Sequence, residues 1–173
     1  MISWETIIRQ EGQGVWRTAY RLLGNRADAD EVFQETFLAA LSFSKRQAVE
    51  CWGALLHRLA TARAVDRLRQ RRRRNTRQEL ADFDFVGSGE AEPFQNAMAG
   101  ELSERLRMAL GQLPERQAEV FCLHALEGWE HAEIAKQMRI TSDAVGVLLH
   151  RARARLRELL APVISDCKRE VTS

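Results

Sequence analysis

The stretch from Glu127 to Leu160 constrains the fold of this chain most, because it holds two helical patterns separated by only a few residues. Apolar residues recur at helical spacing from about Trp129 to Met138, and again from about Ser142 onward. The residues Arg139 to Thr141 between them indicate a tight turn. Two helices joined in this way are typical of a helix-turn-helix, whose second helix enters the major groove of DNA.

The composition of the whole chain favours a water-soluble helical protein. Of its 173 residues, 45% are hydrophobic and 29% charged, whereas only 7% are aromatic and 3 are proline, which argues against an all-β fold. The sequence has no apolar run near the roughly 20 residues needed to span a bilayer. The N-terminus lacks a signal-peptide pattern. We therefore expect a cytoplasmic location and no membrane insertion.

The net charge of +2 hides a sharp asymmetry along the chain. Residues 63–77 contain eight arginines against the single Asp66, which gives 8 − 1 = +7. Residues 79–104 contain seven acidic residues and no lysine or arginine, which gives −7. A basic segment beside an acidic one indicates an interaction surface and a boundary. Nucleic acid is the anion that best explains the arginines, and a solvated charge run is the plain alternative.

The helical patterns predict an all-α fold of two small helical domains joined by an acidic flexible linker, the second domain being the helix-turn-helix unit. The first domain should contain helices over about 2–23, 28–43 and 49–74. The linker contains Gly87, Gly89 and Pro93, and it could lie along a basic channel or fold back onto the arginines. The predicted boundaries are 1–76 for the first domain, 77–100 for the linker and 101–173 for the second domain.

Local signals predict how individual helices begin, end and face the core. Ile8 should share the buried stripe of the first helix, and Gly24 should end that helix. Asp28 should cap the second helix, with Glu31 completing a capping box. Leu102 should lie on the inner stripe of the first helix after the linker. Three further signals concern the second domain: Pro114 at the first helical position, Arg139 in the turn and Thr141 as an N-cap.

No catalytic machinery is expected in this chain. Cys122 and His124 could in principle hold a metal, but no second pair of metal ligands supports them, and a buried thiol is the simpler interpretation. The three cysteines are too widely spaced to predict a disulfide framework. We expect no enzyme activity, no metal and no cofactor.

Two separate segments resemble one family, the extracytoplasmic-function group of bacterial sigma factors. The stretches 28–38 and 59–69, followed by the arginine run, resemble the second conserved region of that group. Four motifs resemble its fourth region: Leu113–Gln117, Glu127–Gly128, Glu133–Ala135 and His150–Arg153. The matching segments occur in the family's order, with a linker of the family's length between them.

The resemblance implies partners and roles for specific residues. The first domain would bind the β′ clamp helices of core RNA polymerase, the second would lie by the β flap, and both would contact promoter DNA. Core polymerase would be bound by Asp30, Glu31, Gln34 and Glu35, for which a solvated acidic face is the plain alternative. The −10 element would be bound by Arg63, Arg67, Arg69, Arg71, Arg72, Arg73 and Arg74. The −35 element would be bound by Arg139, Ser142, Asp143, Gly146, Val147, His150, Arg151, Arg153 and Arg155.

The sequence departs from the family pattern where the recognition helix should read bases. Polar residues usual at three groove-facing positions are replaced here by Gly146, Val147 and Leu148. Since these residues offer no side-chain donors or acceptors, we expect −35 binding to depend on phosphates and DNA shape. Val147 and Leu148 could instead form an apolar patch for an anti-sigma factor.

Two other classes of protein compete with this interpretation. A free-standing helix-turn-helix regulator would leave the N-terminal acidic helix and the arginine run unexplained. A helical protein-binding adaptor without a DNA role would leave the eight arginines of 63–77 unexplained.

Overall fold

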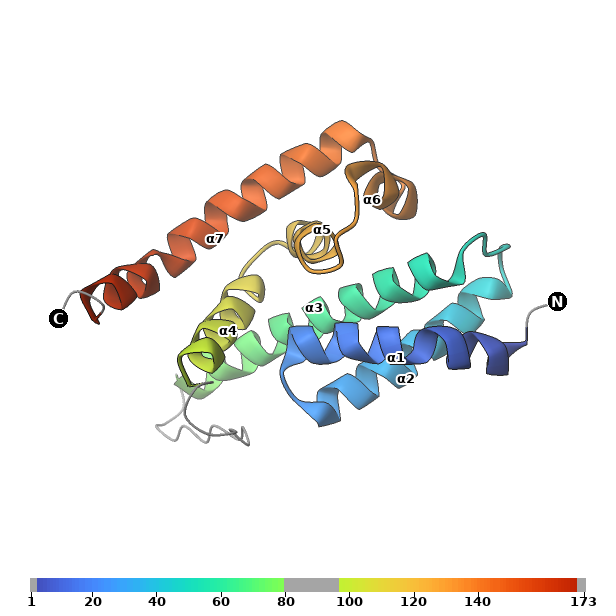
Figure 1. Ribbon diagram of the computed structural model, residues 1–173, viewed down its shortest axis with the longest axis horizontal. Helices are drawn as coiled ribbons and strands as arrows, with labels where there is room; N and C mark the ends of the chain where they lie inside the picture. The colour runs from blue at the N-terminus through green and yellow to red at the C-terminus, as the bar shows by residue number, and fades with distance from the viewer. Residues whose placement is uncertain (1–2, 80–96, 171–173) are drawn as a thin grey trace.

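The computed structural model describes the backbone of residues 3–79 and 97–170, and the side chains of residues 3–77 and 100–162. Within these residues the chain forms helices and no strand, which confirms the expected all-α class. Figure 1 shows α1 to α3 packed side by side, with α5 to α7 on one side of them. The helices are α1 (Trp4–Leu23), α2 (Arg26–Ser44), α3 (Trp52–Glu79), α4 (Ala97–Leu110), α5 (Glu115–Ala125), α6 (His131–Met138) and α7 (Ser142–Glu170).

Helix α1 packs against α2 and α3 through an apolar stripe. Ile7 is 2% exposed on this stripe, whereas Ile8 is 45% exposed, so the prediction that Ile8 faces the core was wrong by one position. The helix ends at Gly24, whose φ of 72° lies in the left-handed region, as expected. A side chain at Gly24 would also collide with the guanidinium of Arg107, whose Nε donates to the Leu22 carbonyl at 3.1 Å.

Helix α2 begins two residues earlier than the sequence suggested. Its N-cap is Asn25, whose side-chain oxygen accepts a hydrogen bond from the Asp28 backbone amide at 2.8 Å. The prediction that Asp28 caps the helix was therefore wrong. The carboxylate of Asp28 pairs with Arg71 on α3. Burial alone would raise the pKa of Asp28, but hydrogen bonds from Arg71 and Asn25 hold it below the ordinary value.

The helix-turn-helix has the geometry that the sequence predicted. Arg139 ends α6 in the left-handed conformation, with φ 54° and ψ 49°, which is uncommon for a residue with a side chain. The Thr141 hydroxyl then accepts a hydrogen bond from the Ala144 amide at 3.1 Å, which confirms its role as the cap of α7. The apolar sides of α5, α6 and α7 close over one core cluster formed by Val120, Leu123, Ile134, Ala135, Met138, Val145 and Leu149.

Two smaller predictions in the second half were wrong. Pro114 is the N-cap of α5 and not its first helical residue, because the helix begins at Glu115. Leu102 is 49% exposed and lies off the buried stripe of α4, where Ala109 and Leu110 are buried. Helix α4 starts at Ala97, and α3 extends to Glu79, so the expected linker falls mainly on residues 80–96, outside the described residues.

The largest core cluster joins the two halves of the chain. Ala19, Leu22 and Val65 from the first half share it with Leu110, Cys122 and Leu156 from the second. Polar contacts also lie along this boundary between the two halves, called the seam below. Arg69 donates a hydrogen bond to the Leu113 carbonyl at 2.8 Å. Within the described ranges, no helix has the combination of length and apolarity that membrane crossing requires.

Candidate nucleic-acid interface

The C-terminal turns of α3 carry a dense group of exposed arginines. Arg72, Arg73 and Arg74 are all exposed, and none forms a salt bridge to a described residue. Adjacent like charges destabilise a helix slightly. Three unpaired arginines side by side therefore make a surface suited to a polyanion such as a nucleic-acid backbone.

The other arginines of α3 are engaged within the protein. Arg67 Nη1 lies 2.5 Å from Glu31 Oε2, and Arg67 Nη2 lies 2.8 Å from Glu35 Oε1. Arg71 pairs with Asp28 and donates to the Leu23 carbonyl at 3.0 Å. Arg63 Nη1 lies 3.9 Å from Glu35 Oε2, and Arg69 binds a backbone carbonyl across the seam. The seven arginines predicted to bind DNA thus divide into four engaged ones and three that have no salt bridge to any described side chain.

The acidic face of α2 is accessible and partly neutralised. Asp30, Glu31 and Gln34 are exposed, and Glu35 is half-buried. The Trp16 indole donates to Asp30 at 2.7 Å, while Arg67 spans Glu31 and Glu35 from the neighbouring helix. The four residues predicted to bind polymerase therefore lie together on one helix face.

The predicted DNA-reading residues of the second half gather around the turn and along the outer face of α7. Arg155 Nη1 pairs with Glu158 at 2.8 Å, and Arg139 Nη2 donates to Gln47 Oε1 at 2.8 Å. The remaining side chains offer hydroxyl, imidazole, carboxylate and guanidinium groups toward solvent. The exposed members are Arg139, Ser142, Asp143, Val147, His150, Arg151, Arg153 and Arg155.

The three unusual apolar positions on α7 differ from one another in their surroundings. Leu148 packs against the core shared by α5, α6 and α7, so it is not free to read bases. Val147 is 49% exposed, so the apolar patch inferred from the sequence reduces to this one residue. A Cβ built at Gly146 meets no atom within 4 Å, so no neighbour in the protein requires glycine there.

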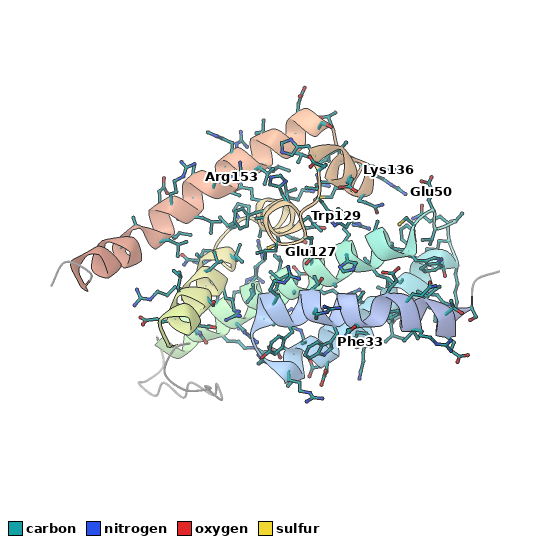
Figure 2. All side chains as sticks on the ribbon, viewed as in Figure 1. Phe33, Glu50, Glu127, Trp129, Lys136 and Arg153 are labelled. Carbon is teal, nitrogen blue, oxygen red and sulfur yellow. The ribbon has the colours of Figure 1, made fainter. Side chains whose placement is uncertain are left out.

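A polar cluster at the seam was not predicted from the sequence. The Glu127 side chain is only 10% exposed, and its Oε2 lies 3.1 Å from His57 Nδ1. The Thr18 hydroxyl donates to Glu127 Oε1 at 3.0 Å, and Arg21 lies 3.8 Å away. Burial alone would raise the pKa of Glu127, but the hydrogen bonds from His57 and Thr18 and the charge of Arg21 hold it below the ordinary value. Figure 2 shows Glu127 between α5 and the α1–α3 layer.

A second seam contact reaches the helix-turn-helix itself. Lys136 Nζ on α6 lies 2.8 Å from Glu50 Oε2 on the loop before α3. Figure 2 labels the two residues beside each other. Together with the hydrogen bond from Arg139 to Gln47, this contact holds the start of the turn against the first half. Both contacts are exposed, so each contributes little to stability alone.

Cys122 and His124, considered above as metal ligands, have other surroundings. Cys122 is fully buried in the core that joins the halves, and this burial raises the pKa of its thiol to about 12. His124 Nδ1 lies 2.9 Å from the Trp129 carbonyl. Among the described side chains, no three His, Cys, Asp or Glu groups converge as a metal site would require.

Family models match both halves of the chain. The model for Sigma-70 region 2 matches residues 7–74, and that for Sigma-70, region 4 matches residues 103–156. The ECF RNA polymerase sigma factor SigE of Mycolicibacterium smegmatis is 32% identical over 166 residues, 96% of this chain and 65% of that protein. SigF of Caulobacter vibrioides, also described as an ECF RNA polymerase sigma factor, is 32% identical over 149 residues, 84% of this chain and 79% of SigF.

Solved structures of similar fold extend the comparison. CnrH in complex with the cytosolic domain of CnrY matches with a TM-score of 0.57 and 23% identity, over 91% of this chain and 87% of CnrH. The sigma factor RpoE in complex with the anti-sigma factor NepR, from Bartonella quintana, matches with a TM-score of 0.56 and 18% identity. That match covers 91% of this chain and 96% of RpoE.

Proposed function

The chain belongs to the sigma-70 family, in its extracytoplasmic-function group, and from this basis we propose that it is the promoter-recognising subunit of a bacterial RNA polymerase. It binds core polymerase, recognises −10 and −35 elements and promotes strand opening, while the polymerase performs the chemistry. This function places it in the cytoplasm, as a subunit without catalytic residues of its own. The chain spans only 65% of the length of SigE. Its activity and its partners are therefore proposed from the residues of this chain.

The observation that carries the proposal is the presence of both sigma regions in one chain, each with an exposed charged surface. The first half offers the acidic face of α2 to core polymerase and Arg72 to Arg74 to the −10 element. The second half offers the outer face of α7 to the −35 element. Promoter-specific initiation by core polymerase in the presence of this chain is the direct test.

The face of α7 favours −35 binding through phosphates and DNA shape. Its exposed arginines can neutralise phosphates, and the bare backbone at Gly146 allows close approach to the duplex. Direct base readout is limited to Ser142, Asp143 and His150, because Val147 and Leu148 have no hydrogen-bonding side chain. Each mismatched base pair in the −35 element should therefore cost less than in a protein that reads bases through bidentate pairs.

Replacing Arg151 and Arg155 with alanine is expected to weaken binding to −35 duplex DNA. Each phosphate contact contributes about 0.9 to the slope of log K against log salt, so the slope should fall by about 1.8. Fluorescence anisotropy over a range of salt concentrations measures both affinity and slope. The matched control replaces Arg9, which is exposed, and Arg105, which is half-buried; both are paired with acids one turn away. Unchanged affinity and slope in the α7 variant would remove α7 from the DNA interface.

The shared core implies that the two halves separate during promoter binding. Elements at −10 and −35 are roughly 25 base pairs apart, or about 85 Å along B-DNA at 3.4 Å per pair. Side chains of both halves meet in one core cluster, so the two modules cannot both reach their elements while that cluster is intact.

An anti-sigma factor is a further proposed partner. It would act by stabilising the arrangement in which the two halves share one core.

A further inference from the structure

A network of ion pairs, called the ladder below, joins α2 to α3. It is formed by Arg67 at its centre and by Asp28, Glu31 and Glu35 around it. The Arg67 guanidinium contacts Glu31 at 2.5 Å and Glu35 at 2.8 Å, and it lies 3.7 Å from Asp28. Burial alone would lower the pKa of Arg67, but its hydrogen bonds to Glu31 and Glu35 raise it above the ordinary value. The positive charge of Arg67 is thus directed at the acidic face of α2 and away from solvent.

The ladder is accessible enough for its partners to be exchanged. The Arg67 side chain is 23% exposed, while those of Glu31 and Glu35 are 60% and 43% exposed. Exposed ion pairs contribute only about 0–1 kcal/mol each, so a competing charge can replace one partner at small cost. One turn further on, Arg72 to Arg74 have no such partners among the described residues.

We propose that Arg67 couples polymerase binding to −10 DNA binding, an inference that rests on the proposed function. In the free protein, Glu31 and Glu35 hold Arg67 and keep it from DNA. When a basic surface of core polymerase binds these carboxylates, the Arg67 guanidinium is released to a phosphate of the −10 strand. In the first half, the free protein therefore offers Arg72 to Arg74 to −10 DNA without Arg67, and the polymerase-bound protein gains at least the Arg67 contact.

Thermodynamic linkage makes this coupling reciprocal. If polymerase raises the affinity for −10 DNA by some factor, the DNA raises the affinity for polymerase by the same factor. One added phosphate contact to single-stranded DNA steepens the slope of log K against log salt by about 0.7. The affinity that this contact adds therefore grows about fivefold as the salt concentration falls from 1 M to 0.1 M. The carboxylates thus limit DNA binding by protein that is not yet assembled with polymerase.

The test imitates polymerase by removing the negative charges on α2. We expect the full chain carrying Glu31→Gln and Glu35→Gln to bind a fluorescent single-stranded DNA about fivefold more tightly at 0.1 M salt, with a slope steeper by about 0.7. The control carries Glu5→Gln and Glu101→Gln, which give the same change in net charge and also remove the acidic partners of two arginines, Arg9 and Arg105. The control should bind DNA as the native chain does.

A third substitution identifies the released group. Adding Arg67→Gln to the Glu31→Gln/Glu35→Gln variant should abolish the gain in affinity, whereas adding Arg9→Gln should leave the gain intact. An equal gain in the charge-matched control, or a gain that survives Arg67→Gln, would overturn the proposal. Circular dichroism on each variant shows whether it is folded.

Binding of the native chain to core polymerase, measured in parallel, separates this inference from the proposed function. A native chain that fails to bind core polymerase contradicts the proposed function. A native chain that binds core polymerase, while the α2 variant shows no gain for DNA, contradicts only the role of Arg67.

Discussion

Replacing Arg72, Arg73 and Arg74 with glutamine should lower the affinity for single-stranded −10 DNA about a hundredfold at 0.1 M salt. Three lost contacts at about 0.7 each reduce the slope of log K against log salt by about 2. Between 1 M and 0.1 M salt, this difference in slope lowers the affinity about a hundredfold. Arg72 to Arg74 dominate because they are exposed and form no salt bridge to a described residue, whereas Arg63, Arg67, Arg69 and Arg71 already have partners inside the protein. Anisotropy titrations at several salt concentrations measure the effect.

The matched control replaces Arg9, Lys45 and Arg46 with glutamine. These residues are exposed and carry the same charge, but they lie away from the end of α3. Affinity and slope should stay close to native in this control. A similar loss in both triple variants would mean that net charge, and not the surface formed by Arg72 to Arg74, governs DNA binding.

Replacing Glu127 with alanine should lower the free energy of unfolding by about 2 kcal/mol at pH 7, because hydrogen bonds to charged groups contribute about 1.5–3 kcal/mol. The substitution leaves His57, Thr18 and Arg21 without the carboxylate that they share across the seam. Because one core joins the halves, the native chain should unfold in a single transition. Urea denaturation followed by circular dichroism measures both properties.

The dependence of this effect on pH has a definite sign. The pKa of Glu127 is below its ordinary value of 4.5 in the folded chain, so the ionised group stabilises the fold above pH 4.5. That contribution is lost as the pH falls through the folded pKa, so the difference in stability between the native and Glu127→Ala proteins should shrink there. Glu158→Ala removes an exposed carboxylate paired with Arg155 and should cost little at any pH. Equal losses from Glu127→Ala and Glu158→Ala at pH 7 would show that the seam cluster does not stabilise the fold.

Local signals predicted the second half of the fold well. The helical spacing of Val145, Leu149 and Ala152 placed α7 correctly, and Thr141 caps it as expected. Arg139 lies in the turn as predicted, in the left-handed conformation. These features depend on residues within a few positions of one another, so they can be inferred from the sequence directly.

Adjacent alternatives were harder to separate. Ile7 and Ile8 both fit a helical stripe, and packing against α2 and α3 selects Ile7. Asn25 and Asp28 are both good N-cap residues. Asn25 caps α2, whereas the Asp28 carboxylate binds Arg71, which lies 43 residues away in the chain. The outcome in each case was decided by tertiary contacts that no local pattern contains.

The same limit applies to the candidate site. The sequence identified the arginines of α3 as a group, but it could not show that Arg67 faces Glu31 and Glu35 while Arg74 is exposed. The seam pair of His57 and Glu127 joins residues 70 positions apart, and neither stood out in the charge pattern. The assignment of individual residues to polymerase or DNA remains a prediction that the variants above address.

Reconstitution with bacterial core RNA polymerase would reveal whether this chain directs promoter-specific initiation. A pool of genomic promoter fragments would be transcribed by core polymerase with and without the full chain, and the transcript starts mapped. We predict a discrete set of starts that depends on the native chain and is lost with the Arg72, Arg73 and Arg74 variant. Failure of the native chain to bind core polymerase, together with transcript starts unchanged by its addition, would contradict the account.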